Sequence, residues 1–199
     1  MPAEEAPAEP EEQPAEEGPE AEAEPEAPAA PARAPGELGI PDDVTVLEGS
    51  PSGAERHVGV VVARAHGEVT NGLLESALSA LLLAGVGSER ITVMPVPGAF
   101  ELPIGAMALA KTRRFGCVVA LGCIVEGDGQ GAGYVAAEAA SGLQLAGLET
   151  GVPVAYGVVT VTSEEAALAA VEKGGAAARS ALEMADLFSQ IRAQAKASA

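Results

Sequence analysis

Aromatic residues are scarce in this 199-residue chain. They make up 3% of the sequence, and tryptophan is absent, whereas hydrophobic residues as a group make up 48%. A folded core must therefore be filled by Ala, Val, Leu and Ile rather than by large rings. The length is that of one domain with an appendage.

Cations are also few. The chain has 11 Lys and Arg against 29 Asp and Glu, which gives a formal net charge of −18. Such a balance disfavours a nucleic-acid partner, because the phosphate backbone would be repelled. The charge is uneven: residues 1–40 contain twelve Glu and one Arg, and thus carry −11 of the total. The remaining −7 is ordinary for a soluble domain.

Cysteine is limited to Cys117 and Cys123. They lie six residues apart on one predicted strand, roughly 20 Å from each other, which is too far for a disulfide. No Cys or His spacing typical of a metal site occurs, so we expect no metal. These features favour a reducing cytoplasm. We expect no membrane partner, because no uncharged apolar run reaches the length of a span and the acidic N-terminal stretch lacks the apolar core of a signal peptide.

The N-terminal stretch, residues 1–42, consists mainly of Pro, Glu and Ala. Proline interrupts any helix and the like charges repel one another, so we predict a disordered acidic tail followed by a folded domain over residues 43–199. Two interpretations of the tail remain open. It is a solvating segment, the commoner role of such blocks, or an acidic tether for a basic partner or cargo.

After the tail, apolar runs alternate with amphipathic helical patterns. The alternation predicts an α/β three-layer sandwich with a four-stranded parallel sheet whose strands are covered on both faces. Its ligand crevice is expected at the carboxyl ends of the strands. We predict Thr70 or Asn71 as the cap of the first helix and a break in the last helix at Gly174-Gly175. The predicted strands are 57–63, 90–96, 116–125 and 152–161, and the predicted helices begin at 67, 99, 133 and 163.

A glycine-rich loop follows the third predicted strand, within GCIVEGDGQGAGYV at 122–135. Its GDGQGA segment matches the relaxed dinucleotide fingerprint only weakly, because it does not open the first strand–helix–strand unit. The plain alternative is a flexible loop before a helix N-terminus that holds a small anion. His66, one of two histidines in the chain, lies in the first crevice loop.

Several runs together resemble the lumazine synthase family, over residues 55–192. They are ARAHGEVTNGLLE (63–75), ITVMPVPGAFELP (91–103), ALGCIVEGD (120–128), YVA (134–136), ETGVPVAYGVVT (149–160) and ALEMADL (181–187). The resemblance implies a flavodoxin-like parallel sheet and a riboflavin-pathway transferase that uses no cofactor. It also implies a homo-oligomer, either a pentamer with sites between neighbouring subunits or an icosahedral shell of 60 chains.

Part of the family's pyrimidine site persists in this sequence. The resemblance implies a binding turn and a strand end that line the substrate, and an aromatic side chain, usually Phe, that the neighbouring subunit contributes. The matching positions here are Ala99, Phe100, Glu101, Cys123, Ile124, Val125 and Tyr156.

The residues that carry the family's chemistry are replaced. The proton-transfer His falls on Gly131, a phosphate-holding Thr on Gly129, and an Arg on Glu126, whose carboxylate would repel a phosphate. The phosphate-gripping Arg after the fourth strand falls on Ala170, and several residues of the next turn are missing.

Two further positions belong to the altered site. Asp128 adds another negative charge to the phosphate region, and Ala65 stands where the family has an aromatic that stacks on the pyrimidine. His66 beside it is only a weak substitute for the missing His, since proton transfer needs position as well as pKa.

The favoured hypothesis is a catalytically impaired or inactive homologue kept as a self-assembling pentamer or shell scaffold. One alternative is an active 6,7-dimethyl-8-ribityllumazine synthase that condenses 5-amino-6-(D-ribitylamino)uracil with 3,4-dihydroxy-2-butanone 4-phosphate. Another is a protein that binds a ribityl-pyrimidine or a flavin without turnover.

Overall fold

The computed structural model describes residues 38–126 and 131–197. The chain divides into two units, Met1–Val44 and Thr45–Ala199. In the first unit, residues 38–44 include a turn in which the Val44 N–H donates to the Pro41 carbonyl at 3.0 Å. The predicted disorder of the acidic tail concerns mainly residues outside the described ranges, and the predicted domain boundary after residue 42 stays a prediction.

The second unit alternates strands and helices. Its elements are β1 (Val58–Ala63), α1 (Gly67–Leu83), η1 (Ser88–Arg90), β2 (Ile91–Val96), η2 (Ala99–Glu101), α2 (Leu102–Lys111), β3 (Cys117–Val125), α3 (Ala132–Thr150), β4 (Val154–Val161), α4 (Glu164–Leu168) and α5 (Lys173–Ala197).

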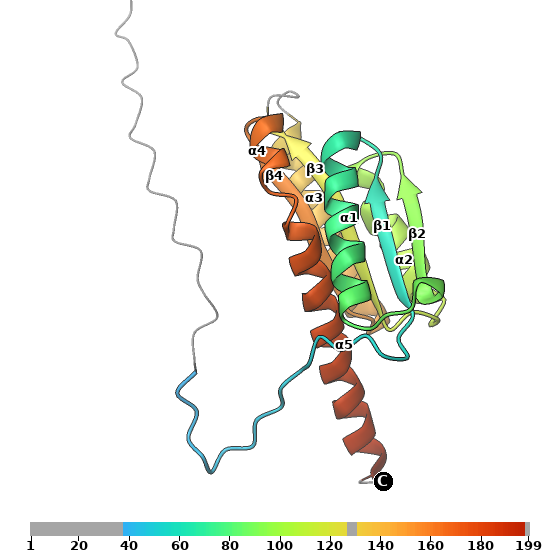
Figure 1. Cartoon of the computed structure of the whole chain (residues 1–199), viewed down its shortest axis with the longest axis vertical. Helices are drawn as coiled ribbons and strands as arrows, with labels where there is room; N and C mark the ends of the chain where they lie inside the picture. The colour runs from blue at the N-terminus through green and yellow to red at the C-terminus, as the bar shows by residue number, and fades with distance from the viewer. Residues whose placement is uncertain (1–37, 127–130, 198–199) are drawn as a thin grey trace, which may run out of the picture. The chain divides into compact units, whose positions relative to one another are not determined.

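The four strands form one parallel sheet in the order β2-β1-β3-β4. Helices α1 and α5 cover one face, and α2 and α3 cover the other (Figure 1). The predicted three-layer α/β sandwich with a parallel, flavodoxin-like sheet is therefore confirmed. Because the chain winds outward from β1 in both directions, the strand order reverses between β1 and β3, which is where such folds place a crevice.

The strands differ in how much of their surface is covered. Every residue of β1 and β3 is buried. The prediction that all strands are covered on both faces was wrong for both edge strands. Thr92, Val93 and Pro95 of β2 are exposed, as are Tyr156 and Thr160 of β4. An edge strand has no neighbour on one side, and this position also tolerates Pro95, which has no N–H to donate.

Two aliphatic cores flank the sheet. The core under α1 and α5 includes the buried side chains of Leu73, Leu81 and Leu182. The core under α2 and α3 includes Leu102 and Leu143, both nearly inaccessible to solvent. The expectation that aliphatic residues would replace rings is confirmed for most of both cores, with Phe115 as a buried aromatic in the second.

The cap of the first helix and the start of the second differ from their predictions. Helix α1 begins at Gly67, with His66 as the N-cap, so Thr70 and Asn71 are not caps. The Thr70 hydroxyl instead donates back to the His66 carbonyl at 3.3 Å. The predicted helix from residue 99 divides into η2 and α2, because Pro103 has no N–H and so fits only the first turn of a helix.

The predicted break at Gly174-Gly175 was wrong. The chain leaves the helical path between α4 and α5, and both glycines lie buried in the first turn of α5. They are needed for close packing against α1: a Cβ on Gly174 would lie 2.0 Å from the Leu73 carbonyl oxygen. Glycine here allows two helix backbones to approach and does not end a helix.

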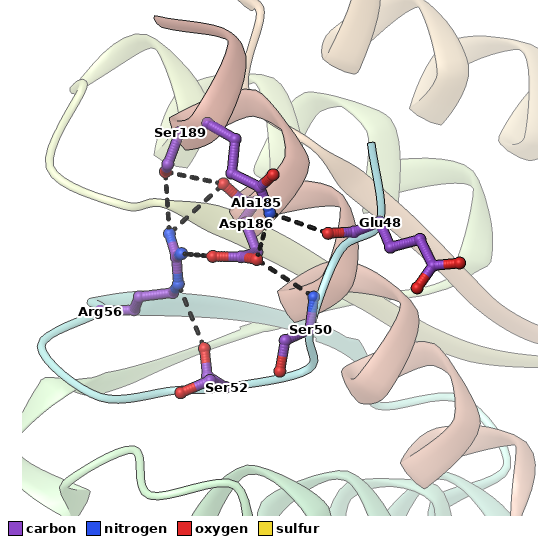
Figure 2. A network of polar contacts seen from close by, with 8 residues as sticks. Glu48, Ser50, Ser52, Arg56, Ala185, Asp186 and Ser189 are labelled. Atoms are coloured by element: carbon purple, nitrogen blue, oxygen red, sulfur yellow. Dashed lines mark hydrogen bonds and ion pairs between the residues drawn. The ribbon is translucent and has the colours of Figure 1, made fainter. Parts of the chain in front are cut away.

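The segment before β1 is tied to α5 by a polar network (Figure 2). Arg56 donates to the Asp186 carboxylate at 2.9 Å and to the Ser189 hydroxyl at 3.1 Å. The other Asp186 oxygen accepts from the Ser50 N–H at 3.1 Å and from Gln190 at 2.9 Å. The network fixes the path of the chain into the central strand.

The Asp186 carboxylate should make stability depend on pH. Hydrogen bonds from Gln190 and Ser50, with the nearby Arg56 charge, lower the pKa of Asp186. A lowered folded-state pKa gives stability that is complete above the unfolded pKa and is lost as pH falls through the folded pKa. We therefore expect Asp186→Asn to lower the melting temperature at pH 7, and the difference from wild type to shrink towards pH 2.

Thermal unfolding followed by circular dichroism between pH 7 and pH 2 measures this difference. Glu183→Gln on the same helix is the matched control, and its melting temperature should stay close to that of the wild type at every pH. A gap between Asp186→Asn and wild type that stayed constant down to pH 2 would contradict the role given to the charge.

Candidate functional site

A hollow of about 280 Å³ lies at the carboxyl ends of β1 and β3, at the predicted crevice. Its walls come from the turn after β1, from η2, from the end of β3 and from the first turn of α3. The lining residues are Ala65, His66, Ala99, Cys123, Ile124, Val125, Gly131, Ala132 and Val135. The fold thus brings together seven of the fourteen positions that the sequence assigned to the site, whereas Phe100, Glu101, Glu126, Tyr156 and Ala170 do not line the hollow.

The lining is small and apolar apart from the His66 imidazole and the Cys123 thiol. Gly131 is the N-cap of α3, and a Cβ built there would meet nothing within 4 Å. There is thus room for a larger side chain at this position. Glu126 follows β3 directly and is exposed, so a carboxylate stands beside the hollow. Asp128 and Gly129 lie outside the described residues.

His66 is held in an uncommon backbone conformation. Its φ is 52° and its ψ is 54°, in the left-handed region, which costs a residue other than glycine about 1 kcal/mol or more. Its carbonyl accepts from the Thr70 N–H at 3.0 Å and from the Thr70 hydroxyl. These bonds fix the turn that places the half-buried His66 side chain at the hollow.

The three residues Ala99, Phe100 and Glu101 of one turn differ in burial and in contacts. Ala99 is buried and lines the hollow, whereas 58% of Phe100 is exposed. The Glu101 carboxylate accepts the Gly98 N–H at 2.9 Å, which closes a capping box at the start of η2. In the isolated chain Glu101 therefore organises the turn.

Tyr156 does not lie at this hollow. It lies on the edge strand β4 and lines a second hollow of about 540 Å³ between β4 and α5, together with Lys173 and Met184. Partial burial raises the pKa of Tyr156, and a hydrogen bond with Thr160 opposes the rise. Ala170 is also elsewhere, packed against the core under α1 and α5.

Both cysteines are buried, and neither forms a disulfide. Burial raises the pKa of Cys117 to about 12, although the Arg56 charge opposes the rise. The Cys117 thiol is therefore protonated at neutral pH and is no nucleophile there. Cys123 lines the hollow but is only 2% exposed.

Two features escaped the sequence interpretation. Lys173 lines the same hollow as Tyr156. In the sequence, the only indication of this was that Lys173 stands at the start of the last helix, after the shortened turn. A basic hollow lies at the amino ends of the strands, lined in part by Arg56, Arg113 and Arg114. In the sequence, this hollow was indicated by two short basic runs, Arg56-His57 and Arg113-Arg114. Each precedes a strand, and the two strands are neighbours in the parallel sheet.

The described ranges contain no cluster of three or more His, Cys, Asp or Glu side chains arranged to hold a metal ion. Across the same ranges, no helix combines the length and apolar character needed to span a membrane.

Residues 55–189 match the sequence family described as 6,7-dimethyl-8-ribityllumazine synthase. Over 155 residues, the chain is 39% identical to the 6,7-dimethyl-8-ribityllumazine synthase of Yersinia pestis (strain Pestoides F). This match covers 75% of this chain and 99% of that relative. The same values hold for the enzyme of that name from Yersinia pseudotuberculosis serotype O:1b (strain IP 31758). The matched range spans the whole sheet and the hollow at its carboxyl end. The chain therefore belongs to the 6,7-dimethyl-8-ribityllumazine synthase family.

Proposed function

We propose that the chain is a self-assembling lumazine synthase homologue in which the synthase reaction is impaired or lost. In this proposal it forms a pentamer or a shell of 60 chains in the cytoplasm and uses neither a metal nor an organic cofactor. The observation that carries the proposal is the lining of the carboxyl-end hollow. Gly131 opens α3 where the family has its proton-transfer His, and the rest of the wall is mostly small and apolar.

The size of the losses supports this proposal. Removing a general acid or base typically costs about 10²–10⁴ in rate. A lost charge-assisted contact to a phosphate costs roughly 1.5–3 kcal/mol. Ala170 replaces the phosphate-gripping Arg of the family, and Glu126 places an exposed carboxylate beside the anion region. All these changes act on one pair of substrates.

Assembly is supported by apolar side chains left exposed on the α2 and α3 layer. Tyr134, Leu145 and Leu148 fall within one stripe of α3, because their spacings of 11 and 3 residues return to nearly the same helical angle. Tyr134 is 78% exposed and Leu148 is 75% exposed, as is Ile104 on α2. Large apolar side chains gathered on one face are typical of a protein interface.

The separation of Tyr156 from the first hollow also supports an oligomer. Tyr156 lies on the edge strand β4, away from the residues that it would join in the family's site. A neighbouring copy that presented its β4 edge to the carboxyl-end hollow would bring these two parts together. One chain by itself cannot do so.

Sedimentation velocity of the purified chain tests the assembly. We expect a pentamer or a 60-chain shell, and expect Leu148→Glu to reduce the assembly by burying a charge in the interface. Leu83→Glu is the matched control, because Leu83 is at least as exposed as Leu148 but lies at the end of α1. Wild-type protein that sediments only as a monomer would contradict the proposal.

A second candidate, an active synthase, is favoured by one observation: His66 lies at the same hollow as Gly131. If His66 moves the proton, the wild type forms lumazine and His66→Ala abolishes most of that activity. If the chain only binds a ribityl-pyrimidine or a flavin, it quenches riboflavin fluorescence without turnover. These outcomes separate the two alternatives from the assembly proposal.

A further inference from the structure

A basic hollow of about 350 Å³ lies at the amino ends of the strands, opposite the end that carries the family's site. The segments that enter β1, β3 and β4 meet there, beside the late part of α5. Its lining residues are Glu55, Arg56, His57, Arg113, Arg114, Phe115, Gly116, Gly151, Val152 and Arg192. Four of the chain's 11 Lys and Arg side chains thus gather at one place.

Most of this positive charge is uncompensated. Arg56 is paired with Asp186 at 2.9 Å, and Glu55 pairs with Arg90 at 3.5 Å. Arg113 donates to the Thr150 carbonyl, and Arg192 stacks over the Phe188 ring. Among the described residues, no carboxylate forms an ion pair with Arg113, Arg114 or Arg192. This is unusual in a chain whose formal net charge is −18.

The turn that carries the arginine doublet is rigid and strained. Arg113 has φ 59°, in the left-handed region that favours glycine, and Glu55 in the same lining has φ 66°. Thr112 fixes the turn, since its hydroxyl donates to the Leu109 carbonyl at 2.7 Å and accepts the Arg114 N–H at 3.2 Å. Strain of this kind often marks places where side chains serve a function.

We propose that this basic hollow binds the acidic N-terminal segment, residues 1–37, of the same chain or of a second copy. The segment supplies twelve Glu against one Arg, which complements the uncompensated arginines. Arginine is suited to such a partner, because its planar guanidinium donates two parallel hydrogen bonds to a carboxylate. The basic partner of the acidic tail is thus found on the folded domain of this protein itself.

The length and charge of the segment fit this role. Thirty-seven residues in extended form span more than about 100 Å, which is ample to reach a hollow on a domain of this size. Each exposed Glu–Arg pair is weak and screened by salt, so binding requires several pairs at once and should fade as ionic strength rises. The proposal is independent of whether the carboxyl-end hollow is catalytic.

Carbodiimide cross-linking of the full-length chain tests the proposal. The reagent joins carboxylates to amines, so Arg114→Lys and Arg192→Lys each keep the charge and add a reactive group at the hollow. Arg64→Lys is the matched control, because Arg64 is an exposed cation at the opposite end of β1. We expect mass spectrometry to find links from residues 1–37 to Lys at position 114 or 192 at least about fivefold more often than to Lys at position 64. A mixture of ¹⁴N- and ¹⁵N-labelled chains shows whether the segment comes from the same chain or another, and either source supports the proposal.

Two further variants keep the result interpretable. Arg113→Gly removes a guanidinium without straining the turn, and Arg113→Gly combined with Arg114→Ser should reduce the links to Lys at position 192 several-fold. Links should also fall in 0.5 M NaCl, and circular dichroism confirms that each variant is folded. Equal linking at positions 64, 114 and 192, or linking that is insensitive to salt and to loss of the doublet, would overturn the proposal.

Discussion

Placing histidine at position 131 and arginine at position 170 is expected to raise lumazine formation at least about tenfold over the wild-type chain. Gly131 caps α3 at the edge of the hollow, and a Cβ there meets nothing within 4 Å among the described residues, so a larger side chain can begin at this position. Within one chain Ala170 lies outside this hollow, packed against the core under α1 and α5, so an arginine there is expected to act on the hollow of a neighbouring copy, as proposed for Tyr156. Absorbance of the product with both family substrates measures the change.

The two substitutions should have separable effects. Gly131→His supplies a proton-transfer group and should raise kcat, whereas Ala170→Arg binds a phosphate and should lower the KM of the phosphorylated substrate. Gly133→His is the matched control, because Gly133 lies in the same helical turn but not at the hollow. If Gly133→His raised the rate of lumazine formation as much as the double variant does, the site assignment would be wrong.

Gly174→Ala is expected to destabilise the fold by about 3 kcal/mol or more, at or above the usual range for overpacking. The added Cβ would lie 2.0 Å from the Leu73 carbonyl oxygen and 2.8 Å from its carbonyl carbon. These are backbone atoms of α1, so no side-chain rotation relieves the clash. The alternative is for α5 to move away from α1, which would open the core that contains Leu73 and Leu182.

Urea unfolding of Gly174→Ala beside Gly133→Ala measures this effect. Both substitutions put alanine for glycine within a helix, but Gly133 has open space around it. Gly133→Ala should therefore be neutral or stabilise by up to about 1 kcal/mol through helix propensity. Equal stability of Gly174→Ala and wild type would mean that the close contact between α1 and α5 does not exist.

The sheet was predictable from sequence, whereas the cap of α1 and the packing role of Gly174 were not. The continuous apolar runs of β1 and β3 are typical of strands covered on both faces, and both are buried throughout. The cap of α1 was missed because His66 caps the helix in a left-handed backbone conformation without a side-chain hydrogen bond, so no Ser, Thr, Asp or Asn marks the position. Gly174 was read as a helix breaker because the approach of α1 depends on tertiary packing between segments about 100 residues apart.

The same contrast holds for the sites. The carboxyl-end hollow could be predicted in part, because Ala65, His66 and Ala99 follow parallel strands, whose carboxyl ends meet at one edge. Tyr156 was placed in that site by resemblance, but within one chain it faces a different hollow. The basic hollow could be predicted only in part, because Arg192 joins the arginine doublet only through the path of α5.

The most direct test of the central claim is the rate of lumazine formation by the purified wild-type chain. The two family substrates are incubated with it in the assembled state, beside a Yersinia relative at equal concentration and a reaction without protein. A homologue kept for assembly predicts a rate near that of the uncatalysed condensation and at least about 100-fold below the relative. Turnover comparable to that of the relative would contradict the account, and the altered hollow would then be a rebuilt active site.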